Sequence, residues 1–164
     1  GFVPKANGIA MIKLSRMADY GVLLMTELAR DHDTLRTASG LAANTSLPTP
    51  TVSKVMKLLT HGGLLESQRG AQGGYALAHP PEQITVADII GAVEGPIALT
   101  DCVGDDGALC EIEALCPTRT NWGRINAVMN EALGRVTLAE MALLPVDFNQ
   151  MFPVVENPED GVSP

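Results

Sequence analysis

Three cysteines are the residues whose chemistry stands out most clearly in this chain of 164 residues. Cys102, Cys110 and Cys116 lie within fifteen residues of one another, and the chain has no other cysteine. In a reducing compartment, clustered thiols more often hold a metal or carry out redox chemistry than form disulfides. The sequence therefore predicts a thiolate site in residues 102–116.

The spacing of the cysteines leaves three kinds of site open. Seven residues separate Cys102 from Cys110 and five separate Cys110 from Cys116, so the C-x2-C pattern of common zinc sites is absent. Gaps rich in glycine and aspartate would let the chain wrap an object larger than one ion, and iron–sulfur clusters take thiolate ligands. A zinc site completed by histidine or aspartate, and three inert buried thiols, are the alternatives.

The elements that position these cysteines begin with a pattern of helices. Ser15 predicts the start of a helix that runs to about Asp31, with apolar residues three and four apart on one face. Thr37 begins a short helix that ends near Asn44, a residue type that tolerates left-handed backbone. A third helix follows, with Thr49 as its cap and a proline in its first turn.

The third helix is the candidate recognition helix of a helix-turn-helix. It has one apolar stripe, and its opposite face is polar. Lysines on such a face are usually only solvated, but this position favours phosphate contacts, and the hydroxyl side chains could reach base edges. The candidate DNA-binding residues on this helix are Thr49, Thr51, Ser53, Lys54 and Lys57.

Two short strands, residues 64–67 and 74–77, are predicted after the third helix. Residues 68–73 join them as a glycine-rich tip that carries Arg69. A helix-turn-helix followed by such a ribbon is typical of a winged helix. Arg69 either pairs with Glu66 across the ribbon or contacts DNA.

Two further helices flank the cysteines. A capping-box-like start at Thr85 opens the first of them. The second and longest helix runs from Thr118 to about Arg135, and its apolar stripe needs a partner, most simply the same helix of a second copy. The predicted dimerisation residues are Trp122, Ile125, Met129 and Leu133.

Charge is divided between the two halves of the chain. Residues 1–80 contain eight Lys/Arg and five Asp/Glu, whereas residues 81–164 contain three Lys/Arg and fourteen Asp/Glu. The local field matters more for binding than the net charge of −8, so a polyanion is expected to dock on the N-terminal half only. No apolar run approaches the roughly 20 residues of a membrane span, and no signal-peptide layout is present, so we expect a cytoplasmic protein without membrane contact.

No arrangement for catalysis is present in the sequence. His32, His61 and His79 share no ligand spacing, and each is expected to be an ordinary surface or helix-end histidine. No Ser/His/Asp set, phosphate-binding loop or paired acid site is present. We therefore expect neither an enzyme nor a protein with a small-molecule substrate.

Four segments carry a resemblance to a known family: MIKLSRMADYGVLLMTELA, LPTPTVSKVMKLLTHGGLLESQRGAQGGYALA, ITVADIIGAVEGPIALTDC and CPTRTNW. They resemble the Rrf-type family of bacterial winged-helix regulators, which includes the iron–sulfur regulator IscR, the nitric-oxide sensor NsrR and the iron regulator RirA. The similarity is greatest to regulators of SUF-system iron–sulfur cluster assembly, and it covers roughly residues 11–145.

The resemblance implies that Cys102, Cys110 and Cys116 ligate an iron–sulfur cluster. IscR-like members carry a histidine three positions after the third cysteine. Here Arg119 stands there, and a guanidinium cannot ligate iron. NsrR-like members use a carboxylate from the first helix of the other subunit, which matches Asp19. The resemblance thus implies a 4Fe–4S rather than a 2Fe–2S cluster completed by Asp19 across a dimer, and insertion of the wing with Arg69 into a minor groove.

The predicted fold is mainly α, a winged helix-turn-helix with a small two-stranded wing and a long C-terminal dimerisation helix. The predicted function is that of a homodimeric, cluster-dependent regulator binding double-stranded operator DNA, controlling iron–sulfur assembly or iron homeostasis genes. A cluster-free thiol- or nitric-oxide-sensing repressor is one alternative, and an iron–sulfur carrier or scaffold is another. The expected segments are a disordered or non-native leader (1–10), the winged domain (11–80), a helix with the cluster-binding loop (81–117), the dimerisation helix with a short last helix (118–145) and a flexible acidic tail (146–164).

Overall fold

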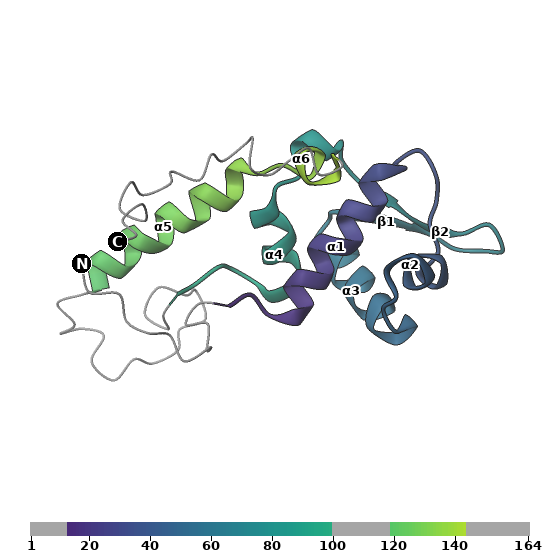
Figure 1. Ribbon diagram of the computed structural model, residues 1–164, viewed down its shortest axis with the longest axis horizontal. Helices are drawn as coiled ribbons and strands as arrows, with labels where there is room; N and C mark the ends of the chain where they lie inside the picture. Colours follow the sequence, from purple (N-terminus) through teal and green to yellow (C-terminus); the bar gives the residue numbers. More distant parts are fainter. Residues whose placement is uncertain (1–12, 100–118, 144–164) are drawn as a thin grey trace, which may run out of the picture.

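The computed structural model describes residues 13–99 and 119–143, which form a mainly helical fold with a two-stranded antiparallel wing, as predicted (Figure 1). The three cysteines, the leader and the acidic tail lie outside the described residues. The elements in order are α1 (Arg16–Arg30), α2 (Ala38–Thr45), α3 (Thr49–His61), β1 (Leu65–Gln68), β2 (Gly74–Leu77), the 3-10 turn η1 (Pro81–Gln83), α4 (Val86–Glu94), α5 (Arg119–Arg135) and α6 (Leu138–Ala142).

Side-chain caps begin several of these helices, because the first backbone N–H groups of a helix have no partner within it. The hydroxyl of Ser15 accepts from Ala18 N at 3.1 Å, which confirms the predicted start of α1. Thr37 caps α2 by accepting from the backbone N–H of Gly40. At α4 the predicted capping box is present.

Two predicted helix ends were wrong by one or two residues. The left-handed residue that ends α2 is Ser46, with φ 57°, rather than Asn44, whose side chain instead donates to Glu27 Oε1 at 3.2 Å. The cap of α3 is Pro48 rather than Thr49. The Pro48 carbonyl accepts the first helical hydrogen bond, from Val52 N at 3.1 Å, and Thr49 therefore lies inside the first turn.

The core lies between α1, α2 and α3 and extends to the elements on either side of the cysteine segment. The predicted stripe of α3 is completely buried. Ile84, Ile89 and Leu138 join the same apolar cluster, although they are distant in sequence from α1–α3. A second, smaller cluster joins Ala18 of α1 to Val86 and Ile90, with Ile97 and Leu133 packed against it.

The wing pairs Leu65 with Leu77 and Gln68 with Gly74. A short antiparallel bridge fastens β2 to the segment before α2, where Arg36 and Tyr75 exchange backbone hydrogen bonds of 3.0 and 2.9 Å. This approach requires glycine at position 74, because a Cβ there would lie 2.9 Å from the Arg36 carbonyl oxygen.

The chain returns from α5 to the winged core through a bridge between Thr85 and Thr137. A second capping box starts α6, and both the backbone N–H and the hydroxyl of Thr137 donate to Glu140. These two bonds lower the pKa of Glu140 from its ordinary 4.5. Because the folded-state pKa is depressed, the stabilisation from this box is present above the ordinary value and is lost as the pH falls through the folded one.

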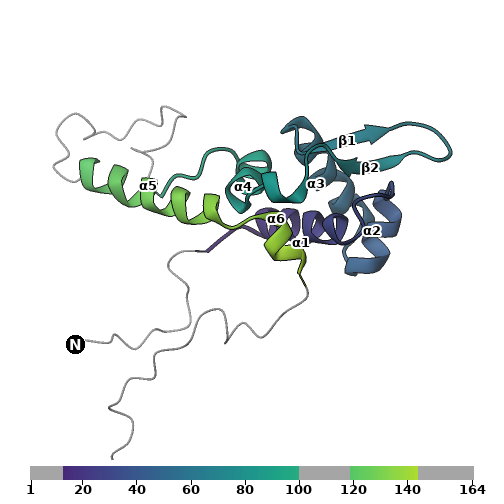
Figure 2. The same cartoon turned by 90° about the horizontal axis from the view of Figure 1, so that it is seen from above.

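Helix α5 extends from the winged core on the side opposite the wing, as the two perpendicular views show (Figures 1 and 2). Within residues 13–99 and 119–143, no helix combines the length and apolar character needed to cross a bilayer.

Candidate nucleic-acid interface and the frame of the cysteine segment

The outer face of α3 carries the residues predicted to bind DNA. Lys54 and Lys57 are exposed on this face, and Thr51 and Ser53 are half-buried beside them. Among residues 13–99 and 119–143, neither lysine forms an ion pair. A shallow concavity runs along this face, and the described residues lining it are Pro50, Ser53, Lys54, Lys57, Leu58 and His61.

Arg69 directly follows β1, in the loop that joins β1 to β2. The β1–β2 hairpin projects from the rest of the molecule (Figure 2). The side chain of Arg69 is exposed, and no ion pair joins it to Glu66 within the described part of the chain. The alternative in which Arg69 merely pairs with Glu66 is therefore not supported, and the DNA contact remains a prediction.

Arg36 is a basic residue of the winged domain whose charge is already used within the fold. Its guanidinium lies 3.8 Å from Glu27 and 3.8 Å from Asp31, and only 20% of its side chain is exposed. Together with the backbone bridge to Tyr75, these contacts join α1, α2 and the wing. We expect Arg36 to orient the wing rather than to contact phosphate.

Asp19, the predicted fourth cluster ligand, is exposed in the first turn of α1. Its backbone N–H donates to Ser15 O at 3.1 Å, and the Ser15 hydroxyl donates to the carboxylate of Glu94 at the end of α4. From Glu94 the chain continues through residues 97–99 to the cysteine segment (residues 100–118). The turn that carries Asp19 is thus held against the element that leads to the thiols.

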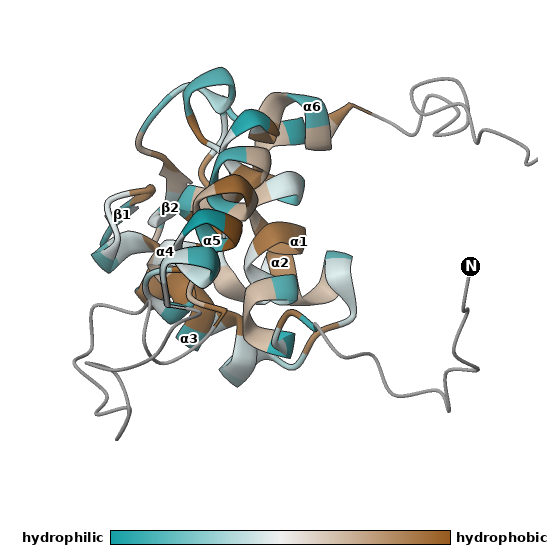
Figure 3. Cartoon of the chain, turned by 90° about the vertical axis from the view of Figure 1, so that its left-hand side faces the viewer, coloured by the Kyte–Doolittle hydropathy of each residue, from teal (hydrophilic) through white to brown (hydrophobic). Residues whose placement is uncertain are grey.

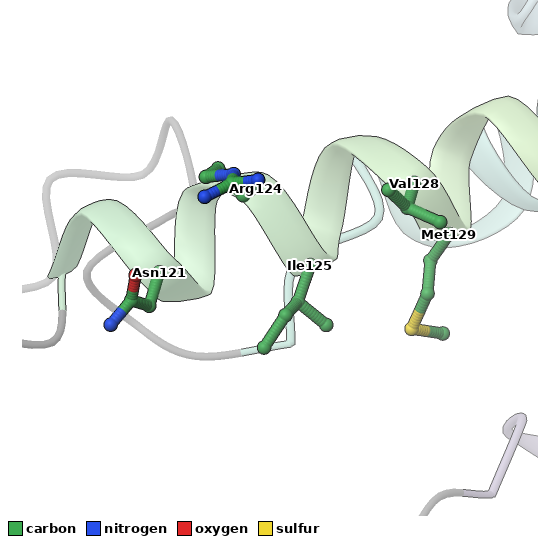
Figure 4. A pocket seen from close by; sticks show the side chains of 5 residues that line it. All are labelled: Asn121, Arg124, Ile125, Val128 and Met129. Atoms are coloured by element: carbon green, nitrogen blue, oxygen red, sulfur yellow. The ribbon is translucent and has the colours of Figure 1, made fainter.

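The face of α5 that points away from the winged core is apolar and open. Ile125 is 46% exposed and Val128 is 64% exposed, with Trp122 partly exposed beside them. Ile125 and Met129 point to the same side of the helix, along a shallow concavity that Asn121, Arg124 and Val128 also line (Figure 4). Both hydrophobic and hydrophilic segments occur along α5, as expected of an amphipathic helix (Figure 3).

Two residues of α5 were missed by sequence reasoning. Val128 lies three residues after Ile125 and so belongs to the same stripe, whereas the predicted Leu133 packs against the second cluster of its own chain. Asn126 is buried and bonds to the backbone of residues 97–99. Two asparagines four apart, at 126 and 130, on a helix face that packs against the core were the available signal.

A metal site built only from the described residues is not present. In residues 13–99 and 119–143, no three His, Cys, Asp or Glu side chains gather closely enough to hold a metal ion. His32, His61 and His79 are each exposed, as expected for surface histidines. The ligand role predicted for Cys102, Cys110 and Cys116 lies outside the described residues.

A helix-turn-helix with an exposed basic recognition helix, a wing whose loop carries an arginine and a projecting apolar helix defines a winged-helix DNA-binding regulator. The sequence matches the Rrf2 family model, described as an iron-dependent transcriptional regulator, over residues 14–143. The chain belongs to the Rrf2 family. It is a DNA-binding transcriptional regulator and not an enzyme.

Two regulators of this family, from three bacteria, illustrate the similarity. The transcriptional regulator CymR of Bacillus subtilis is 33% identical over 132 residues, which cover 80% of this chain and 90% of CymR. The structure of that protein, described as the global cysteine regulator, matches with a TM-score of 0.63 and covers 80% of this chain and 97% of its own. IscR of T. potens matches with a TM-score of 0.62 at 30% identity, covering 80% and 86%. CymR of Staphylococcus aureus in its oxidized form gives 0.61 at 28%, covering 81% and 98%.

The two proposed kinds of DNA contact predict different effects of substitution. Lys57→Ala should weaken binding to operator and random duplexes about equally. It should also flatten the dependence of log affinity on log salt by about 0.9 for each phosphate that the variant no longer neutralises. Arg69→Ala should weaken operator DNA selectively, because an arginine in a minor groove responds to groove width. Fluorescence anisotropy across a salt series measures both. If both variants show the same decrease in affinity on both duplexes, the assigned roles are wrong.

Proposed function

We propose that this protein is a homodimeric regulator whose affinity for operator DNA is set by an iron–sulfur cluster bound to Cys102, Cys110 and Cys116. The observation that carries the proposal is the donor set. Three thiols lie within fifteen residues, between the winged core and the projecting helix, in a family described as iron-dependent. Thiolates are the usual protein ligands of iron–sulfur clusters, so the residues present fit such a group.

Asp19 is the proposed fourth ligand, supplied by the partner subunit. Its exposure in the first turn of α1 leaves the carboxylate accessible, and a hard oxygen ligand on one iron would make that corner of a 4Fe–4S cluster the most readily exchanged. When bound, the cluster supplies a centre that is sensitive to iron supply, oxygen or nitric oxide. A cluster held in this way would connect the winged domain of one subunit to the cysteine segment of the other.

Regulation would result from thermodynamic linkage between cluster binding and the arrangement of the dimer that binds DNA. A cluster that binds two arrangements of the dimer with different affinity shifts their populations by that difference. A coupling of about 1–3 kcal/mol would change operator affinity by about 5- to 150-fold. Genes for iron–sulfur assembly or iron homeostasis are the proposed targets, because a regulator that carries a cluster reports the demand for clusters directly.

Anaerobic purification followed by iron, sulfide and zinc analysis tests the cofactor. We expect a brown protein that absorbs broadly in the visible range, with iron and sulfide approaching about four of each per subunit, as a 4Fe–4S cluster requires. A colourless protein with one zinc per subunit would rule out the cluster.

Mixed dimers test whether Asp19 acts across the interface. One subunit carries Asp19→Ala with its cysteines intact, and the other carries Cys110→Ala with Asp19 intact. If Asp19 acts in trans, the mixed dimer should hold one complete cluster site. If it acts within its own subunit, neither site is complete. Iron content and resistance of the cluster to a chelator distinguish the two results, and homodimers of each variant are the controls.

A second candidate function is a cluster-free thiol sensor. The observation that favours it is the similarity to CymR, described as the global cysteine regulator in B. subtilis and studied in an oxidized form in S. aureus. Here the cysteines would respond directly to oxidation or nitric oxide, and the affinity for DNA would follow the thiol state of a metal-free protein. Operator binding by metal-free protein, measured before and after treatment with hydrogen peroxide, separates the two candidates.

A further inference from the structure

Asn126 is a buried polar side chain whose hydrogen bonds leave its own helix. Its Oδ1 accepts from the backbone N–H of Leu99 at 3.1 Å, and its Nδ2 donates to the carbonyl of Ile97 at 2.9 Å. Only 8% of the residue is exposed. A buried amide that satisfies one donor and one acceptor holds both in place, because breaking either bond leaves a polar group with no access to water.

The contrast with Thr26 shows that this arrangement is specific. Thr26 and Asn126 are the two buried polar residues found in the described part of the chain. The hydroxyl of Thr26 bonds only the Val22 carbonyl of its own helix, at 2.8 Å. Asn130 strengthens the link made by Asn126, since its Nδ2 lies 3.3 Å from the Ile97 carbonyl and 3.1 Å from the Asn126 carbonyl.

The position of this link in the chain gives it a consequence. Leu99 is the last described residue before the cysteine segment, with Cys102 three positions further on. Helix α5 begins at Arg119, three positions after Cys116. The hydrogen bonds of Asn126 therefore join residues 97–99, which precede the cysteine segment, to α5, which follows it.

Both partners of this link are also fixed to other parts of the fold. Ile97 packs on the second apolar cluster together with Leu133 of α5. At its far end α5 is anchored where Leu138 N donates to the Ile84 carbonyl at 2.7 Å and Val86 N to the Val136 carbonyl at 2.9 Å. A displacement of residues 97–99 must therefore either move α5 or break the two hydrogen bonds made by the buried Asn126 side chain.

We propose that Asn126 is the positioning residue that transmits the state of the cysteine segment to α5, and through α5 to the spacing of the two winged domains of the dimer. This inference rests on the proposed function, since it assumes that the state of the thiols governs DNA binding. Asn126 touches neither the cluster nor the DNA. Its role is to make residues 97–99 and α5 move as one body.

The test compares Asn126→Leu with Ile90→Ala in the full-length protein. Leucine keeps the number and branching of the side-chain heavy atoms of asparagine, although its two methyl groups are larger, and it can make neither hydrogen bond. Ile90→Ala removes apolar volume from the neighbouring cluster, where Ile90 is 3% exposed, and leaves both bonds of Asn126 available. The quantity measured is the ratio of operator affinity between cluster-loaded and cluster-free protein, with iron content determined on the same samples.

For the wild type the ratio should lie in the range of about 5- to 150-fold, and Ile90→Ala should keep it. Asn126→Leu should retain its iron but bring the ratio to within about twofold of unity, because the positions of its winged domains no longer depend on the state of the cysteines. An unchanged ratio in Asn126→Leu overturns the inference, as does an equal reduction in Ile90→Ala, which would reveal a general effect of stability. A wild-type ratio of one would instead overturn the proposed function and the coupling with it.

Two further measurements keep the inference testable if Asn126→Leu folds poorly. Asn126→Asp keeps the size of the side chain and an acceptor for Leu99, but places a second oxygen against the Ile97 carbonyl, and it should bring the ratio close to unity as well. Amide hydrogen exchange of residues 97–99 in cluster-free protein needs no cofactor. Faster exchange there in both variants, with no change at the Thr26 turn of α1, is expected. Unaltered exchange would mean that Asn126 does not hold this segment.

Discussion

Cys110→Ala is expected to abolish cluster binding and to leave a dimer with the operator affinity of cluster-free protein. Cys110 is the middle one of the three thiols proposed to hold the cluster, and its replacement by alanine leaves two. A cluster that lacks one thiolate has an open iron site that water and oxygen attack. The expected change in operator affinity equals the full holo-to-apo difference, about 5- to 150-fold.

Met141→Ala is the matched control, since it removes a sulfur-bearing side chain that is partly exposed on α6. Iron content, absorbance and operator affinity should match the wild type. The account would be contradicted if Cys110→Ala retained both its iron and its response to chelation. An iron-free Cys110→Ala variant that binds operator like cluster-loaded wild type would show that the cluster has no part in regulation.

Breaking the apolar face of α5 is expected to have the second large effect. Ile125→Glu combined with Val128→Glu would place two carboxylates on the exposed apolar face of α5 that is the proposed dimer interface. Buried like charges oppose association, so the protein should become monomeric. A monomer has one winged domain. Because two winged domains can no longer bind the operator at the same time, operator affinity should fall by about 10²- to 10⁴-fold. Sedimentation velocity and anisotropy measure the two effects.

Ala127→Glu adds a carboxylate to the same helix, on an exposed position away from the Ile125–Val128 stripe. It should leave the dimer and its DNA affinity nearly unchanged, apart from a small electrostatic penalty. If the double variant remains dimeric, the exposed face of α5 is not the dimer interface. If the double variant is monomeric but binds operator like the wild type, one winged domain is sufficient for operator binding and dimerisation has another role.

Much of the fold could be predicted because its signals are local. The apolar stripe of α3 follows helical periodicity, and every member of it is buried. Capping residues at Ser15 and Thr85 mark the starts of helices in the sequence itself. The glycine-rich tip between two short apolar runs was enough to predict the wing. The predicted helix ends were wrong by one or two residues where neighbouring residues can both end or cap a helix, as at Asn44 and Ser46 or at Pro48 and Thr49.

The parts of the site that could not be predicted depend on contacts between distant segments. The pair of asparagines at 126 and 130 indicates a polar contact on this face of α5, but it does not identify the partner, because the backbone N–H of Leu99 lies 27 positions away. Leu138 is completely buried in the main core, although its own short helix gives little apolar pattern. Leu133 was predicted to face a second subunit because periodicity shows which residues share a face, but not what covers it.

Dependence of DNA binding on the cluster is tested by measuring the operator affinity of one dimer preparation in two states. The operator is selected from random duplexes with anaerobic, cluster-loaded protein. Affinity for it is then measured before and after the cluster is removed by chelation, with dimerisation checked in both states. We expect operator affinity to change by about 5- to 150-fold and to return to its first value when the cluster is rebuilt. The same affinity with and without the cluster, in a protein that remains dimeric, would contradict this dependence on the cluster.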